Sequence, residues 1–307
     1  MRKIFLSIVL FYYLSSLAYA QQKSMYTQYM FNTLAINPAY SSMDDALTIT
    51  GLSRQQWVGF KGAPRTQTLS MHTPINESNT SFGVMLSNDQ IGEVVKESGG
   101  YLTIAQKVEI MEETFLAVGF NGGVSSFRAT YSDNFPNSPA SQYDPVFQNS
   151  KEMRANFGFG VMLFSEKYYV GFSSPHFYYR DFASLGKEAA ATAYKPHYML
   201  QAGYLFNLGE DFKLKPNVLA KYVSGSPIQL DFNANLLIAE TFWIGASYRT
   251  LDSFDLMASF YITPSIQLGY SYDFTNTELA KIQKGSHEVM LKARIFGRTR
   301  DQTACYF

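Results

Sequence analysis

The stretch Ser265-Ile-Gln-Leu-Gly-Tyr-Ser-Tyr-Asp-Phe274 alternates apolar and polar side chains without a break. Every second residue from Ile266 to Phe274 is apolar, and the residues between them are polar or glycine. Successive side chains of a strand point to opposite faces, so this segment is predicted to be a β-strand with one apolar face. The segments Ile228–Leu236 and His287–Ile295 show the same alternation.

About fourteen segments of this kind can be placed between residues 46 and 296, most of them roughly ten residues long. That length crosses a bilayer as a tilted strand. The predicted strands are 46–56, 66–74, 80–87, 98–110, 114–128, 154–165, 168–178, 195–207, 212–223, 227–238, 241–250, 253–262, 265–274 and 286–296.

The connections between these strands alternate strictly between two sets. The short set is Ile75–Asn79, Met111–Glu113, Glu166-Lys167, Leu208–Asp211, Ala239-Glu240 and Thr263-Pro264. The other set is Trp57–Arg65, Asn88–Glu97, Ala129–Met153, Tyr179–Tyr194, Ser224–Ser226, Leu251-Asp252 and Thr275–Gly285. Short turns on one side and longer loops on the other are typical of an outer-membrane barrel, with the short turns in the periplasm. An even strand count would place both termini in the periplasm.

The fold class is therefore predicted to be all-β, a transmembrane antiparallel β-barrel of about fourteen strands. The alternative is a soluble double sheet, whose strands also alternate. Long strands and a polar face rich in glycine and charge favour the barrel, as does a girdle of aromatic residues near strand ends. We expect this girdle to contain Tyr168, Tyr169, Tyr178, Tyr179, Tyr222, Trp243 and Tyr248. The last strand should pair with the first, and Pro216 is expected at a bulge or strand end.

The chain begins like a secreted precursor. Arg2 and Lys3 precede the apolar run Ile4–Leu14, and Ala18-Tyr19-Ala20 has the form of a cleavage site. Residues 1–20 are predicted to be a signal peptide, 21–45 a segment that lies in the periplasm or packs in the lumen, 46–296 the barrel and 297–307 a tail. Cys305 is the only cysteine, so an internal disulfide is impossible.

The composition argues against nucleic-acid binding, because 25 Lys and Arg balance 25 Asp and Glu. The polar faces of the strands should turn charges of both signs into the lumen, whereas a selective pore shows one dominant sign. This predicted inward set is Asp231, Arg249, Asp255, Asp273, Glu288, Lys292, Arg294, Lys213, Lys215 and Lys221. His72, His176, His197 and His287 are scattered without metal-ligand spacing, so no catalytic residue, cofactor or metal is predicted.

Residues 21–45 read differently from the strands, because they are rich in aromatic and amide side chains. Tyr26-x-Gln28-Tyr29-x-x-Asn32 is followed by Asn37-Pro38-Ala39-Tyr40, then by Arg54-x-Gln56-Trp57 and Pro64; Gly285-Ser286-His287-Glu288 opens the last strand. With these motifs the chain resembles the PorP/SprF family over nearly its whole mature length. It departs at Ser41-Ser42, where such proteins often carry glycine.

The resemblance implies an outer-membrane component of the type IX secretion system of Bacteroidetes. It implies a role in protein export and surface attachment, including adhesin display in gliding bacteria. Implied partners are outer-membrane lipid, periplasmic secretion components and a secreted adhesin or effector. The family motif residues would contact a partner or pack within the barrel, and Tyr26, Tyr29, Phe31, Tyr40, Arg54 and Trp57 are the candidate anchors. The alternative function is a channel or a transporter of hydrophobic solutes.

Overall fold

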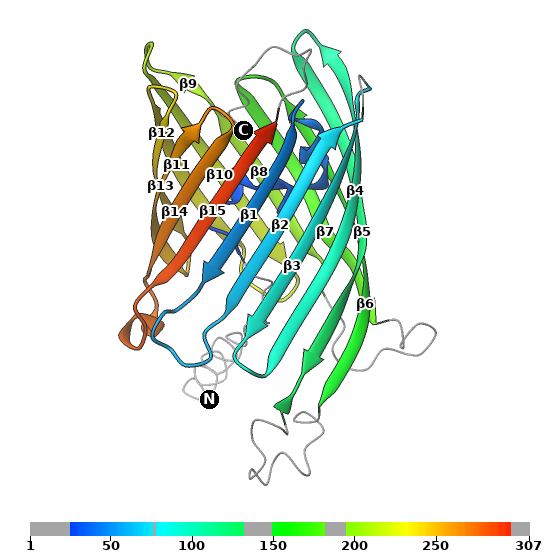
Figure 1. The fold of residues 1–307 in the computed structure, drawn as a ribbon, viewed down its shortest axis with the longest axis vertical. Helices are drawn as coiled ribbons and strands as arrows, with labels where there is room; N and C mark the ends of the chain where they lie inside the picture. The colour runs from blue at the N-terminus through cyan, green and yellow to red at the C-terminus, as the bar shows by residue number, and fades with distance from the viewer. Residues whose placement is uncertain (1–24, 76–77, 132–148, 182–194, 296–307) are drawn as a thin grey trace, which may run out of the picture.

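The alternating segments form a closed antiparallel barrel in the computed structural model (Figure 1). The structure describes residues 25–75, 78–131, 149–181 and 195–295. Its strands are β1 (Leu47–Gln55), β2 (Arg65–Pro74), β3 (Thr80–Ile91), β4 (Val95–Met111), β5 (Thr114–Ala129), β6 (Ser150–Phe164), β7 (Tyr168–Asp181), β8 (His197–Tyr204), β9 (Phe206–Asn207), β10 (Phe212–Val223), β11 (Gln229–Ile238), β12 (Phe242–Arg249), β13 (Ser253–Thr263), β14 (Ile266–Thr275) and β15 (Ser286–Ile295).

The barrel closes between its first and last strands. Pairing of β1 with β15 runs from Leu47 opposite Ile295 to Gln55 opposite His287. The short strand β9 continues β8 along β10, so the wall has the fourteen strands that the sequence predicts. Closure satisfies the edge N–H and C=O groups that an open sheet would leave unpaired in hydrocarbon.

The two ends of the barrel differ in their connections. At the end where Leu47 meets Ile295 the strands are joined by short turns, and we call this the short-turn end. The turn at Ala239 and Glu240 has positive φ values of 47° and 53°, as a two-residue type I′ hairpin requires. The opposite end, at Gln55 and His287, we call the long-loop end. No helix in the described part of the chain is long and apolar enough to span a membrane.

One predicted loop is wrong. Asn88–Glu97 was expected to be a roomy connection, but β3 continues to Ile91 and β4 begins at Val95, with Gly92 at φ 63° in the tight turn between them. Beyond Ile91 and Val95, which adjoin the turn, the strand residues are polar on both faces, as the inward Asp89 and the outward Lys96 show. Hydrophobic alternation therefore ends before the strands do.

Pro216 lies in the middle of β10, neither at a strand end nor at a register shift. It pairs with Ala234 on β11. On its other side the β8 pairing ends at Gly203 opposite Asn217, and pairing resumes on β9 with Phe206 opposite Leu214. Proline has no N–H to donate, so the ladder is interrupted locally while its register is kept.

The predicted girdle is partly wrong. Tyr178, Tyr222 and Tyr248 are exposed on the outer wall. Tyr169 and Trp243 are buried in the lumen, 4% and 2% exposed. Their places on β7 and β12 have the parity of glycine and serine positions, which the strand pleat turns inward.

The predicted inward charges do face the lumen. Nine of them are buried: Asp231, Arg249, Asp255, Asp273, Glu288, Lys292, Arg294, Lys215 and Lys221. Lys213 is half-buried and forms an ion pair of 2.5 Å with Glu240. The predicted signal peptide, the predicted tail with Cys305, and most of Ala129–Met153 and Tyr179–Tyr194 lie outside the described residues.

Candidate functional site

The segment that precedes β1 crosses the lumen from one end of the barrel to the other. We call residues 25–46 the lumen segment. Thr27 contacts Arg54 and Glu288 near the long-loop end, whereas Asp44 contacts Arg294 near the short-turn end. The first residue of β1 and the last residue of β15 lie at the short-turn end, whereas Met25 lies at the long-loop end, beside Thr66 and Asp89. The two chain termini lie outside the described residues.

The lumen segment folds as three short 3-10 turns, η2 (Tyr29–Phe31), η3 (Thr33–Ala35) and η4 (Pro38–Ser42). Asn37 and Pro38 start the last of them, since the Asn37 side chain accepts a hydrogen bond of 3.0 Å from the Ala39 N–H. Proline at the first helical position has no N–H to leave unpaired and has its φ preset. The asparagine–proline pair of the sequence motif is therefore a capping device.

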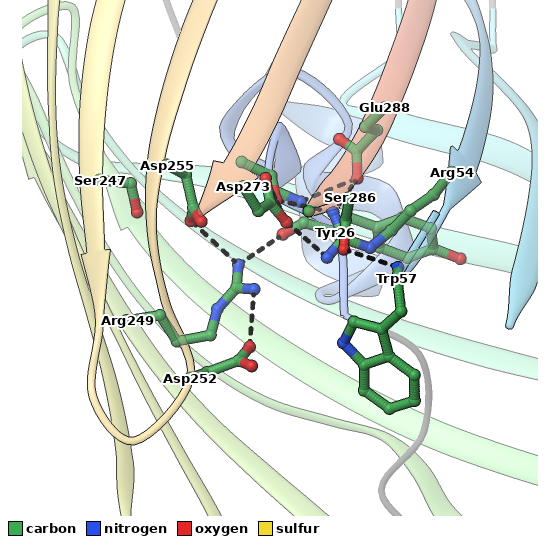
Figure 2. Close-up of polar contacts among 12 residues, drawn as sticks. Tyr26, Arg54, Trp57, Ser247, Arg249, Asp252, Asp255, Asp273, Ser286 and Glu288 are labelled. Carbon is green, nitrogen blue, oxygen red and sulfur yellow. Dashed lines mark hydrogen bonds and ion pairs between the residues drawn. The ribbon is translucent and has the colours of Figure 1, made fainter. Parts of the chain in front are cut away.

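Arg54 of β1 fixes the start of the lumen segment. Its Nη2 lies 2.6 Å from Asp273 Oδ2, and its Nη1 lies 3.2 Å from Glu288 Oε2. Nη1 also donates to Thr27 Oγ1 over 2.8 Å. Glu288 accepts from the backbone N–H groups of Thr27 and Gln28 at 2.9 and 2.8 Å. Figure 2 shows these groups converging from β1, β14, β15 and the lumen segment. Two carboxylates, one guanidinium and two backbone donors thus form one buried network.

Arg249 of β12 forms a second network close to the first (Figure 2). Its Nε lies 2.9 Å from Asp231 Oδ2, and its Nη1 lies 3.3 Å from Asp252 Oδ2. Its Nη2 lies 3.9 Å from Asp255 and donates to the Tyr26 carbonyl over 3.4 Å. This guanidinium therefore neutralises acidic groups of the wall and holds the segment backbone.

Apolar packing fills the lumen between these networks and the short-turn end. Phe31 meets Trp243 edge-on with ring centroids 5.9 Å apart, and the Lys215 ammonium lies 5.1 Å from each ring. The buried cluster around them contains Tyr29, Met30, Ile36, Met199, Leu219, Leu237, Met257 and Met290. Burial of large apolar side chains stabilises this arrangement by roughly 1.5–3 kcal/mol each.

Asp44 and Arg294 hold the other end of the lumen segment. The guanidinium donates to both carboxylate oxygens, at 2.7 and 2.9 Å. Burial acts to raise the pKa of Asp44, but the hydrogen bonds and charge of Arg294 outweigh it and lower the pKa from 3.8 to about 2. Thr48 donates a further hydrogen bond to this carboxylate over 2.7 Å.

We expect Asp44→Asn to lower stability by about 2 kcal/mol at pH 7 and to flatten its acid dependence. The pKa of Asp44 is lower in the folded state, so its contribution is complete above about pH 5 and is lost as the pH falls from about 4 towards 2. Unfolding in detergent, followed from pH 7 to pH 2, measures this. The control is Asp45→Asn, because that carboxylate is 48% exposed beside Lys107. Parallel pH profiles for wild type and Asp44→Asn would contradict the assignment.

Most family motif residues lie within the lumen. Gln28, Tyr29, Asn32, Asn37, Pro38, Tyr40, Arg54 and Glu288 are buried, as is the candidate anchor Phe31. Tyr26 is half-buried and bonds Thr68 through its hydroxyl over 2.7 Å. Asn32 accepts from Ser70 over 2.7 Å, which ties η3 to β2. The buried motif residues therefore pack within the barrel.

The remaining motif residues lie at or near the long-loop surface. Gln56 donates its backbone N–H to the Pro64 carbonyl over 3.0 Å, and these two residues are half-buried. Trp57 is half-buried with φ 46°, and its backbone N–H donates to the Ser286 hydroxyl over 3.2 Å (Figure 2). His287 faces outward and bonds Tyr270 at 2.6 Å. The buried motif residues therefore hold the lumen segment in place inside the barrel. Gln56, Trp57 and Pro64 fix the conformation of the first long loop.

Sequence reasoning missed the partners of these residues. It did not single out Asp44, Asp252 or Trp243 as contacts of the lumen, because the segment has no period and its contacts span more than 200 positions of sequence. Strand parity was the available signal in the sequence, because it places Trp243 and Arg54 on the lumen face of their strands. Among the described residues, no group of three or more histidine, cysteine or acidic side chains could hold a metal ion.

Comparison with known proteins agrees with the architecture. The monoaromatic hydrocarbon channel CymD is 11% identical with a TM-score of 0.50, over 87% of this chain and 93% of that one. Omp33 of Acinetobacter baumannii is 11% identical with a TM-score of 0.45, over 83% and 100% of the two chains. At 11% identity the likeness to CymD shows the fold alone, an outer-membrane β-barrel. No curated protein matches the chain.

The family comparison is more specific. A model of the type IX secretion system membrane protein PorP/SprF matches residues 18–293. This range includes the whole lumen segment and all but the last two residues of the barrel wall. The chain therefore belongs to the PorP/SprF family of type IX secretion system membrane proteins.

Proposed function

We propose that this protein is a non-enzymatic outer-membrane barrel that supports the export or surface anchoring of proteins secreted by the type IX system. It acts through protein–protein contacts, and gliding adhesins are among the secreted proteins it would serve. Family membership supports this role. The filled lumen supports it too, since the working surfaces must then lie on the ends of the barrel and its wall.

The observation that carries the proposal is the lumen segment. From Thr27 to Met43 each residue is buried. The segment is held at its start by hydrogen bonds of Thr27 and Gln28 to Glu288, and at its end by the buried ion pair of Asp44 with Arg294. A solute path through the lumen would require this segment to leave, which would break the Asp44–Arg294 ion pair and leave Glu288 without the two backbone donors of Thr27 and Gln28. For this reason a channel or a transporter of hydrophobic solutes is the second candidate function.

The proposed orientation follows from the two ends of the barrel. The short-turn end would face the periplasm and meet type IX components, and the C-terminal tail that follows Ile295 would lie there. The long-loop end would face the exterior, where the regions Ala129–Met153 and Tyr179–Tyr194 would meet a secreted adhesin or effector. Trp57, at the same end, is the motif aromatic that we assign to partner contact, because it is only half-buried.

The protein, purified with a tag from its own cells in mild detergent, should co-purify with type IX components or a secreted protein. Trp57→Ala should weaken that recovery, and Phe60→Ala is the matched control, since Phe60 lies in the same loop and is 43% exposed. In liposomes the protein should show no stable, size-selective flux, because the lumen is filled. Recovery without any secretion component, together with such a flux, would replace this proposal by the channel.

A further inference from the structure

The outer wall at the long-loop end carries a row of positive charge. Strand register places Gln55 opposite Arg65, Arg65 opposite Gln90, and Gln90 opposite Lys96. The row continues with Lys96 opposite Arg128 and Arg128 opposite Lys151. We call the four cations Arg65, Lys96, Arg128 and Lys151 the cationic row; no carboxylate interrupts it along these registers.

The cations face outward while the neighbouring carboxylates face inward. Each cation is exposed, with the same strand parity as exposed apolar residues such as Leu69, Leu102 and Phe120. The adjacent positions Asp89, Glu97 and Glu152 have the opposite parity, and the last two pair with Arg154. On β4 and β6, therefore, a cation on the outer face lies next to a carboxylate on the inner face. In the part of the chain that the structure describes, no member of the cationic row forms an ion pair.

The height of the row matches the headgroup layer of a membrane. The outward row Leu69, Leu86, Gly100 and Val124 is apolar, and the next row, Gln67, Asn88, Ser98 and Ser126, is polar and uncharged. The cations follow two residues further on, so they lie about 13 Å along the strands beyond the apolar row. Strand tilt reduces this to roughly 9 Å along the membrane normal. The polar layer beyond the hydrocarbon is about 5–8 Å thick, so the cations lie at its outer edge.

The row is local to one side of the barrel. On the other side the register joins Phe232, Tyr248, Phe254 and Phe274 into an outward aromatic row. Lys96, Arg128 and Lys151 lie directly opposite one another on neighbouring strands, about 5 Å apart. Like charges in such positions repel, and no described residue forms an ion pair within 4 Å with any of them. An external anion would remove this repulsion.

We propose that the cationic row binds the phosphate groups of a lipid in the membrane leaflet at the long-loop end. Arginine donates a paired set of hydrogen bonds to phosphate and lysine adds a mobile point charge. The apolar row around Leu69 and Leu86 continues below the cations, so acyl chains can pack on the wall while the headgroup meets the row. This continuity favours a membrane lipid over a soluble polyanion.

The test measures binding of bisphosphorylated lipid A to the purified protein by native mass spectrometry, with dephosphorylated lipid A as the comparison. Each cation near a membrane surface contributes about fivefold to the affinity for anionic lipid. We expect Lys96→Gln/Arg128→Gln to weaken binding of the phosphorylated lipid about 25-fold and the variant lacking all four cations to abolish it. Dephosphorylated lipid A should bind weakly to every variant.

Matched variants separate position from net charge and from folding. Lys167→Gln/Lys281→Gln removes two exposed cations outside the row and should change binding less than about threefold. Arg65→Lys/Lys96→Arg/Arg128→Lys/Lys151→Arg keeps the charge and should keep the binding. Equal binding of the two lipid forms, or equal loss in the two double variants, would overturn the proposal. So would binding to soluble polyphosphate as tight as binding to the lipid, which would identify a soluble polyanion instead.

Discussion

Replacing Arg54 with methionine is expected to destabilise the protein by about 3–5 kcal/mol and to free the start of the lumen segment. Arg54 is 2% exposed and bridges Asp273, Glu288 and Thr27. Removing one partner of a buried ion pair leaves the other charges buried without compensation, and that residual cost sets the size of the effect. Two carboxylates are left here, so the loss should lie towards the upper end of the range.

Two readouts test the Arg54→Met variant. Unfolding by heat or urea in detergent gives the stability, and flux through liposomes shows whether the lumen has opened. The control is Arg154→Met, since Arg154 is half-buried at 22% exposure and pairs with Glu152 at 2.8 Å. Exposed and half-exposed pairs contribute about 1 kcal/mol or less, so this control should stay stable and closed. Equal stability of the two variants would show that the Arg54 network does not hold the segment.

Arg54 also shows how far the sequence alone could reach. On β1 the pleat turns Thr48, Thr50, Leu52 and Arg54 to one face, and the sequence predicts that strand correctly. A buried arginine on the lumen face of a strand requires carboxylate partners. Strand parity does not say which ones, because Asp273 and Glu288 meet Arg54 only after closure brings β15 beside β1.

Tyr169 and Trp243 show where two sequence rules conflict. Their places near strand ends suggested a membrane girdle, whereas parity with Gly171 and Gly245 put them in the lumen. Parity prevailed because it follows from the covalent pleat, while the girdle is a statistical preference of the outer wall. Neither rule predicts where the lumen segment lies. It has no strand or helix period, so only its aromatic and amide content indicated that it must be buried.

Gly119→Val should displace the lumen segment, the second large effect that the structure predicts. Gly119 of β5 faces inward, and a Cβ there would lie 2.6 Å from the Pro38 carbonyl carbon and 2.7 Å from Ala39 Cα. The new Cβ would meet backbone atoms, so no flexible side chain can move away to relieve the contact. Overpacking of this kind costs typically 1–3 kcal/mol and occasionally more, and we expect a loss of about 3 kcal/mol or more at this position.

Gly122 on the same strand provides the matched control, because it faces outward and a Cβ there would meet only the Asn156 carbonyl oxygen at 3.9 Å. Gly122→Val should leave stability within about 1 kcal/mol of wild type. A cysteine at Ala35, which is 8% exposed, reports on the segment itself when Cys305 is replaced by alanine. Maleimide should label that cysteine at least tenfold faster with Gly119→Val than with Gly122→Val. Slow labelling in both would mean that the wall yields around η4 and keeps the segment in place, so stability would fall without any opening of the lumen.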